Sequence, residues 1–190
     1  MTTPGTESSV PRAVVLVEGT SDRRALEALA LRRDRNLEAE GISIVVIGGA
    51  HAVGTFLDRF GPRGLDVGLA GLCDAGEEWA FTRALERAGI GSGLTRDEME
   101  ALGFYVCDAD LENELVRALG AAAVVRIIEG QGELGSFRTF QKQLAKRDLP
   151  LEEQLWRFMW NRKIRYAPLL VDSLDLDRVP RPLDGVLSHV

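Results

Sequence analysis

Residues 13–22 begin with Ala13-Val14-Val15-Leu16-Val17 and end with Glu18-Gly19-Thr20-Ser21-Asp22. The apolar part is mostly β-branched and lacks alternation, which is typical of a strand buried on both faces. Thr20 or Ser21 is placed to cap the helix that follows, whose apolar residues recur at helical spacing. The stretch therefore predicts the first strand and helix of an α/β fold.

Three further apolar segments fit the same sheet, and they cover residues 42–47, 66–72 and 104–107. Gly48-Gly49 ends the second strand, Cys73-Asp74 ends the third, and a capping box begins at Thr95 before the fourth. Strands that alternate with helices imply a parallel sheet with right-handed crossovers. We therefore expect an α/β fold with a mostly parallel four-stranded central sheet flanked by helices, followed by a C-terminal helical extension.

The composition excludes some classes of protein. The 190 residues are 45% hydrophobic, enough for one domain with a sizeable core. The net charge of -6 argues against a general nucleic-acid coating protein, whose affinity comes from many Lys and Arg contacts to phosphate. It leaves room for an enzyme that contacts a few phosphates through metal ions.

No apolar run approaches the roughly 20 residues that a membrane helix needs, so no membrane partner is expected. The start of the chain has no basic and apolar leader, and Cys73 and Cys107 lie in or beside apolar runs. We therefore expect reduced, buried cysteines and a cytoplasmic setting. Residues 1–11 are expected to form a disordered tail, residues 12–118 the catalytic domain, and residues 119–190 a helical extension packed on it.

Acidic residues follow three of the predicted strands. Glu18 follows the first strand, Asp74 the third, and Asp108, Asp110 and Glu112 the fourth. The carboxyl ends of parallel strands face one crevice, where ligands bind. Asp22 lies four residues after Glu18, in the first helical turn, and its side chain can point back to the same edge. These acids are therefore expected to converge.

Clustered carboxylates repel one another, and a divalent cation relieves that repulsion. Mg²⁺ and Mn²⁺ prefer oxygen ligands, and a carboxylate site with two such ions suits phosphodiester hydrolysis. A single acid after a strand is more often a loop or helix-capping residue. Acids at the ends of three separate strands favour a metal site instead.

At these residues a family resemblance appears. The segment Leu16-Val17-Glu18-Gly19-Thr20-Ser21-Asp22 resembles the opening motif of the Toprim fold, found in topoisomerases, bacterial primases and several nucleases. The chain is most similar to the Toprim domain of the OLD (overcoming lysogenization defect) family of nucleases, over roughly residues 13–171. Gly48-Gly49 resembles the glycine turn of that family after its second strand.

The resemblance implies roles for individual residues. Glu18 would be a metal ligand or general acid/base, Asp22 and Asp74 would be metal ligands, and Asp110 and Glu112 match a late pair of ligands, with Asp110 where the family often has Ser. The segment 161–167 resembles the basic segment of the family, in which Lys163 would stabilise the transition-state phosphate. Arg23, Arg162 and Arg165 are candidates for phosphate or nucleic-acid contacts.

The chain departs from the family pattern at two points. Where the family has Asp-x-Asp after the third strand, this sequence has Asp74-Ala75-Gly76, so the second carboxylate is missing. Glu77 or Glu78 could replace it, since both begin the following helix; otherwise one ion is weakly held and catalysis is weak or absent. Asp108 is a further possible metal ligand. OLD proteins also join this domain to an ATPase, whereas this chain has no phosphate-binding Gly-x-x-x-x-Gly-Lys loop.

These features predict an endonuclease that uses Mg²⁺ or Mn²⁺, with two ions or one, to hydrolyse DNA. The first alternative is a module that is catalytically weak or inactive and docks a partner ATPase in trans or another protein. The second alternative is an RNA-processing Toprim nuclease.

Other signals are given structural interpretations. The sequence Gly130-Gln131-Gly132-Glu133-Leu134-Gly135 matches a dinucleotide fingerprint, but we expect a helix–helix turn and no bound nucleotide cofactor. The basic stretch Arg23, Arg24, Arg32, Arg33 and Arg35 is interpreted as a solvated face, with DNA contact as the alternative. The aromatic segment around Trp156 and Trp160 is interpreted as core or partner packing, with base stacking as the alternative.

Overall fold

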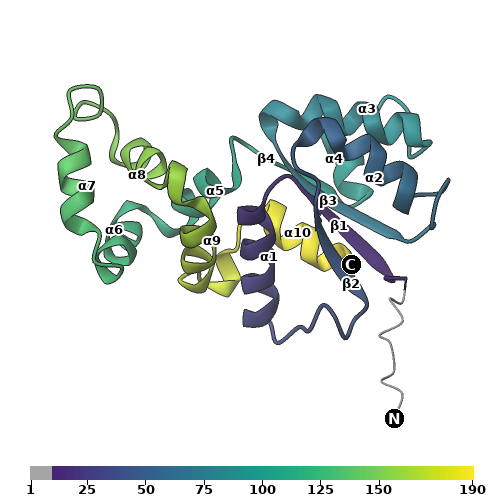
Figure 1. Ribbon diagram of the computed structural model, residues 1–190, viewed down its shortest axis with the longest axis horizontal. Helices are drawn as coiled ribbons and strands as arrows, with labels where there is room; N and C mark the ends of the chain where they lie inside the picture. Colours follow the sequence, from purple (N-terminus) through teal and green to yellow (C-terminus); the bar gives the residue numbers. More distant parts are fainter. Residues whose placement is uncertain (1–9) are drawn as a thin grey trace, which may run out of the picture.

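The computed structural model describes residues 10–190, so most of the predicted disordered tail lies outside the described residues. The four strands are β1 (Ala13–Val17), β2 (Ile42–Val46), β3 (Gly68–Asp74) and β4 (Phe104–Cys107). All pair in parallel in the order β2-β1-β3-β4, which confirms the predicted sheet (Figure 1). In register, Val17 lies opposite Val46 on one side and Leu72 on the other.

Strand β1 is the centre of the sheet and is fully buried, as its apolar sequence predicts. Val15 and Val17 face a core shared with α1 (Thr20–Arg32), whereas Val14 and Leu16 face a second core. The second core is covered by α2 (Val53–Phe60), α3 (Glu78–Ala88) and α4 (Arg96–Ala101). The sheet is therefore a middle layer between helices on both faces (Figure 1).

Everything described after β4 is helical or loop. Six helices follow: α5 (Leu111–Leu119), α6 (Ala121–Gly130), α7 (Leu134–Gln141), α8 (Leu151–Met159), α9 (Lys163–Asp172) and α10 (Arg181–His189). Helix α9 packs along α1, and α10 returns to β3 and β4 (Figure 1). One-turn 3-10 helices are η1 (Ala50–Ala52), η2 (Ala75–Glu77), η3 (Trp160–Arg162) and η4 (Leu176–Arg178).

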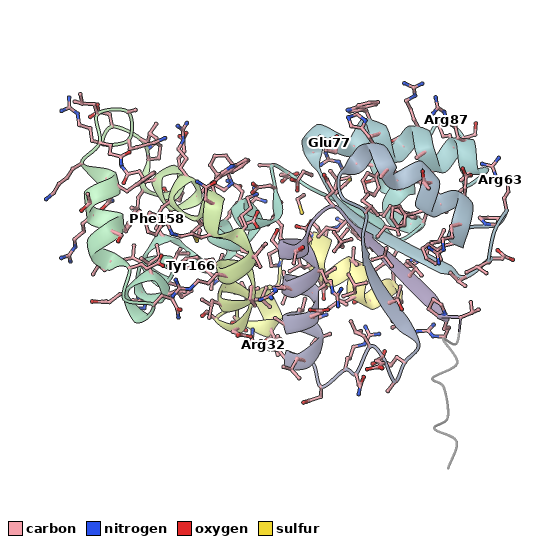
Figure 2. All side chains as sticks on the ribbon, viewed as in Figure 1. Arg32, Arg63, Glu77, Arg87, Phe158 and Tyr166 are labelled. Carbon is pink, nitrogen blue, oxygen red and sulfur yellow. The ribbon has the colours of Figure 1, made fainter. Side chains whose placement is uncertain are left out.

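An aromatic cluster holds the helical part together. Phe158 of α8 packs edge-on against Phe137 and Phe140 of α7, with ring centroids 5.1 and 5.7 Å apart. The buried hydroxyl of Tyr166 donates to Glu133 at 2.8 Å, which ties α9 to the start of α7. Figure 2 shows Phe158 and Tyr166 within this part of the molecule. The helices that carry the basic segment are therefore fixed relative to one another.

Several local predictions are corrected. Thr20 and Ser21 do not cap α1: its N-cap is Gly19, whose N–H donates to Asp22 at 2.8 Å. Strand β3 begins at Gly68 rather than residue 66, because Asp66 has a φ of 50° and belongs to the preceding turn. The predicted turn at Gly130–Gly135 is confirmed, since it joins α6 to α7 and follows a helix, not a strand.

The basic stretch at the end of α1 is largely structural, so the predicted solvated face is wrong for three of its arginines. Arg32 donates to the carbonyl of Val171 at 2.7 Å, and Arg35 donates to that of Val190 at 2.8 Å. Arg33 pairs with Asp184 at 2.6 Å. Figure 2 shows Arg32 where α1 ends. These side chains tie α9 and α10 to the α/β layer.

Both cysteines are buried and free of disulfides, as predicted. Among residues 10–190, every helix is too short or too polar to pass through a bilayer.

Candidate metal and phosphate site

The candidate site lies between β1 and β3, where the order in which the chain adds strands to the sheet reverses. The chain leaves β1 towards β2 and leaves β3 towards β4, on opposite sides, although β1 and β3 are neighbours. Such a switch point opens a crevice at the carboxyl ends of the strands. Glu18 and Asp74 stand at those two ends, and the Asp74 N–H donates to Glu18 Oε1 at 3.0 Å. Parallel pairing therefore brings together two acids that are 56 residues apart.

Asp22 reaches the same crevice from the first turn of α1. Its Oδ2 accepts the Gly19 N–H at 2.8 Å, which turns the carboxylate back towards the end of β1. This is the orientation expected for an acid four residues after Glu18. An acid in the first turn is also favoured by the positive end of the helix dipole.

Asp110 and Glu112 enter at the start of α5. Asp110 is the N-cap and accepts the Asn113 N–H at 2.8 Å, while Glu112 occupies the first turn. Both are buried, with only 6% and 1% of their surface exposed. Buried carboxylates require a positive partner or a proton.

Lys163, the first residue of α9, is that partner. Its Nζ lies 2.9 Å from Asp110 Oδ2 and 2.7 Å from Glu112 Oε2. Glu112 Oε1 remains buried without a hydrogen-bond partner among residues 10–190. One ammonium group thus serves two buried carboxylates, and one carboxylate oxygen in the crevice is free to bind a further positive group.

The electrostatics reflect this crowding. Burial, the nearby Glu112 and Glu18 together raise the pKa of Asp22 to about 7, although the Gly19 N–H opposes the shift. Burial, then Glu18, Asp22 and Asp110, raise the pKa of Asp74 to about 8. Burial also raises the pKa of Glu18 and of Glu112 above their ordinary values. Burial opposes the charge on Lys163, but Glu112 and Asp110 keep its pKa above the usual range.

These shifts predict how stability depends on pH. An acid with a raised pKa keeps a proton in the folded state that the unfolded chain has already released, so the free energy of unfolding falls as pH rises through the folded pKa. With Asp22 near 7 and Asp74 near 8, the Tm of the metal-free protein should fall between about pH 6 and pH 9. Thermal unfolding in EDTA measures this. Asp74→Asn should flatten the slope, and a Tm that rises over this range would contradict the assignment.

The donor set fits a hard divalent cation. All five acids offer carboxylate oxygens, nearby acids help to raise the pKa of Asp22 and of Asp74, and Glu112 Oε1 lacks a hydrogen-bond partner among the described residues. In the arrangement described for residues 10–190, no three of them surround a single point at ligand distance. Two are turned towards Lys163, and three accept backbone N–H groups. Binding an ion would therefore require side-chain rotation, with the backbone already in place.

The three further candidate ligands, Glu77, Glu78 and Asp108, are placed differently. Glu78 pairs with Arg96 at 2.6 Å, and the exposed Asp108 pairs with the same guanidinium at 3.1 Å, so both are engaged outside the crevice. Glu77 is half-buried and close enough to Glu18 to raise its pKa. Figure 2 shows Glu77 where β3 gives way to α3. Of the three, Glu77 is the one positioned near the site.

The basic residues proposed to contact phosphate lie in different surroundings. Arg23 pairs with Glu27 at 2.7 Å on the surface, while its neighbour Arg24 lines a groove with Arg162, Lys163 and Arg165. Arg162 stacks on Phe158 and lies 3.3 Å from Glu133, to which Arg165 is also bonded. Arg24, and not Arg23, therefore lines this groove.

Trp156 contacts a candidate site residue, whereas the sequence analysis interpreted its segment as core or partner packing, with base stacking as the alternative. Its Nε1–H donates to both oxygens of Asp110, at 2.9 and 2.8 Å. Trp156 packs edge-on against Trp160, with ring centroids 4.9 Å apart, and Lys163 Nζ lies 4.4 Å from the Trp160 ring centroid, although the three residues belong to α8, η3 and α9. Their spacings of four and three residues were the available signal in the sequence.

Comparisons with known proteins agree with this geometry. The family model described as "Overcoming lysogenization defect protein-like, TOPRIM domain" matches residues 11–75. The C-terminal region of the Burkholderia pseudomallei OLD protein superposes with a TM-score of 0.73 at 22% identity, covering 94% of this chain and 96% of that chain. Residues 11–75 are therefore similar to an OLD-like Toprim domain, and the fold of the whole chain is similar to that of the C-terminal region of OLD proteins. The C-terminal region of the Xanthomonas campestris pv. campestris OLD protein is also similar, with a TM-score of 0.71 at 25% identity, covering 95% of this chain and 92% of that chain. A search of curated proteins gave no match.

The Toprim match contains Glu18, Asp22 and Asp74 and ends one residue before Gly76. Gly48 and Gly49, with φ values of 75° and 117°, form the turn after β2 that the Toprim resemblance implies. Asp110, Glu112 and Lys163 lie beyond the matched residues, so only the contacts described above place them beside the other acids.

Proposed function

We propose that the protein is a divalent-cation-dependent endonuclease that hydrolyses DNA phosphodiesters. The observation that supports this most is the convergence of acids from β1, α1, β3 and α5 beside Lys163, a cation on a separate helix. An arrangement that only stabilised the fold would not need buried carboxylates in excess of cations.

Each residue has a proposed role. Glu18, Asp22, Asp74, Asp110 and Glu112 would hold Mg²⁺ or Mn²⁺ at the crevice. When bound, such ions make water nucleophilic and stabilise the leaving oxygen. Glu18, at the centre of the sheet edge, would also be positioned to accept a proton from the attacking water. Lys163 would turn from Asp110 and Glu112 towards a phosphate oxygen and stabilise negative charge in the transition state.

The direct test uses supercoiled plasmid. The purified protein should convert it to nicked circles with Mn²⁺ or Mg²⁺, and EDTA should stop the conversion. An RNA substrate assayed in parallel addresses the RNA-processing alternative, for which a preference for RNA would be expected.

Gly76 favours a second candidate function, a module that binds one ion weakly and docks a partner such as an ATPase. The position lacks the second carboxylate of the family pattern, and Glu77 is the available substitute. Calorimetric titration with Mn²⁺ separates the candidates, because two sites support the nuclease and one or none supports the module.

Gly76→Asp is expected to strengthen Mn²⁺ binding by about tenfold, since an added carboxylate raises the charge of the ligand set. A Cβ at residue 76 would meet no atom within 4 Å, and the backbone φ is not in the left-handed region, so the fold should accept the change. Titration calorimetry measures the gain. Gly76→Asn, equal in size but uncharged, should gain less; an equal gain from both would show that charge is not the cause.

A further inference from the structure

A groove of about 790 Å³ is lined by residues at the start of α1 and by residues of η3 and α9. Thr20 and Ser21, next to Asp22, line it from α1, and Lys163 lines it from α9. The groove is lined by Arg24, Arg162 and Arg165 as well, and by the half-exposed Trp160 and Ile164. Lys163 thus belongs both to the groove and to the carboxylate site.

The charge of this groove is opposite to that of the whole chain. The protein has a net charge of -6, yet four basic side chains and no carboxylate line the groove among residues 10–190. Arg162 and Arg165 are partly neutralised by Glu133. Arg24 is exposed and takes part in none of the ion pairs found among those residues. A polyanion is therefore the complementary ligand.

Trp160 adds an aromatic surface at the rim. Lys163 Nζ lies 4.4 Å from its ring centroid, and Trp156 packs edge-on with centroids 4.9 Å apart, yet Trp160 is still 51% exposed. It also lines a second hollow of about 510 Å³ with Lys146 and Arg157, so it forms the ridge between two hollows with basic walls. A half-exposed aromatic ring between surfaces lined by basic side chains is typical of sites where an unpaired base stacks.

We propose that this groove binds a single-stranded segment of nucleic acid, with one unpaired base stacked on Trp160 and the adjoining phosphates along Arg24 and Lys163. A duplex hides the faces of its bases, so Trp160 has a partner only in a single strand. The groove lining favours nucleic acid over a docked protein, because its charges are of one sign. The direction of the bound strand rests on the proposed function, because the strand is taken to lead to Lys163 and the carboxylates where cleavage would occur.

The test measures binding without metal, so that cleavage plays no part. Fluorescence anisotropy in EDTA compares a labelled single strand of about 10 nucleotides with its duplex, for the wild type and variants. Trp160→Ala should weaken single-strand binding by roughly tenfold. Trp79→Ala is the matched control, because Trp79 is equally exposed at 51% but lies on α3, across the sheet from the groove. It should bind as the wild type does.

Two further arms identify the contacts. A strand with abasic sites keeps its phosphates, so it should bind the wild type as weakly as Trp160→Ala binds the intact strand. Arg24→Gln should reduce the slope of log affinity against log salt by about 0.7, the value of one phosphate contact to a single strand. Trp160→Ala should leave that slope unchanged.

The inference is overturned if Trp160→Ala binds the single strand as tightly as the wild type does, or if Trp79→Ala loses as much affinity as Trp160→Ala. It is also overturned if the duplex binds more tightly than the single strand and Trp160→Ala leaves that affinity unchanged. Any of these results would favour a protein partner or the backbone of a duplex as the ligand of the groove. The result is separable from the proposed nuclease: Trp160-dependent binding without nicking supports the groove and rejects the enzyme, and nicking without such binding does the reverse.

Discussion

Glu18→Gln should lower Mn²⁺-dependent nicking of supercoiled plasmid by about 100-fold or more, equivalent to the loss of about 3 kcal/mol of transition-state stabilisation. Glutamine keeps an oxygen that can accept the Asp74 N–H, now 3.0 Å from Glu18 Oε1, so the junction between β1 and β3 should persist. The change removes the negative charge and the basic oxygen from the centre of the site. Gel assays of nicked against supercoiled plasmid measure the rate.

Glu27→Gln is the matched control, because Glu27 lies in the middle of α1, away from the end of β1, and pairs on the surface with Arg23. It should nick as the wild type does, and both variants should keep the wild-type Tm to within a few degrees. Nicking by Glu18→Gln that is as fast as the wild type and equally tolerant of salt would reject the role of Glu18.

Lys163→Met should have two large effects. It should abolish nicking, and it should destabilise the metal-free protein by about 3 kcal/mol at pH 8, because two buried carboxylates lose their cation. Methionine retains a similar length of side chain, so the loss should come mainly from charge. Urea unfolding in EDTA measures the free energy of unfolding.

Mn²⁺ should raise the stability of Lys163→Met more than that of the wild type, because the ion would replace the missing positive charge. Lys142→Met, at an exposed position beyond α7, should change neither stability nor nicking. A Lys163→Met protein as stable as the wild type in EDTA would show that the ammonium group does not stabilise Asp110 and Glu112.

The sheet and the positions of Glu18 and Asp74 were predictable because they follow from local pattern. A run such as Ala13–Val17 indicates a buried strand, and parallel strands bring their carboxyl ends to one edge. The assignment of Lys163 came from the family resemblance, since nothing in its local sequence points to an acid more than 50 residues earlier. The contacts of Lys163 with Asp110 and Glu112 depend on how α9 docks.

Other contacts could not be predicted from the sequence, because no sequence motif marks the residues that form them. Arg32 and Arg35 bind backbone carbonyls near the C-terminus, and any residue supplies such an acceptor. Arg96 lies 18 residues from Glu78 and 12 from Asp108, and its guanidinium binds both acids away from the crevice. Trp156 looked like a core residue, and only the approach of α8 to α5 places its indole N–H on Asp110.

The central claim is that one crevice collects carboxylates to hold divalent cations. A crystal of the protein soaked in Mn²⁺, measured for anomalous scattering, tests it most directly. The account predicts anomalous peaks within about 2.2 Å of oxygens from Glu18, Asp22 or Asp74 and from Glu112, with Lys163 turned away from that carboxylate. Fully soaked crystals that diffract well but show no peak in the crevice, with Lys163 still held between Asp110 and Glu112, would contradict it.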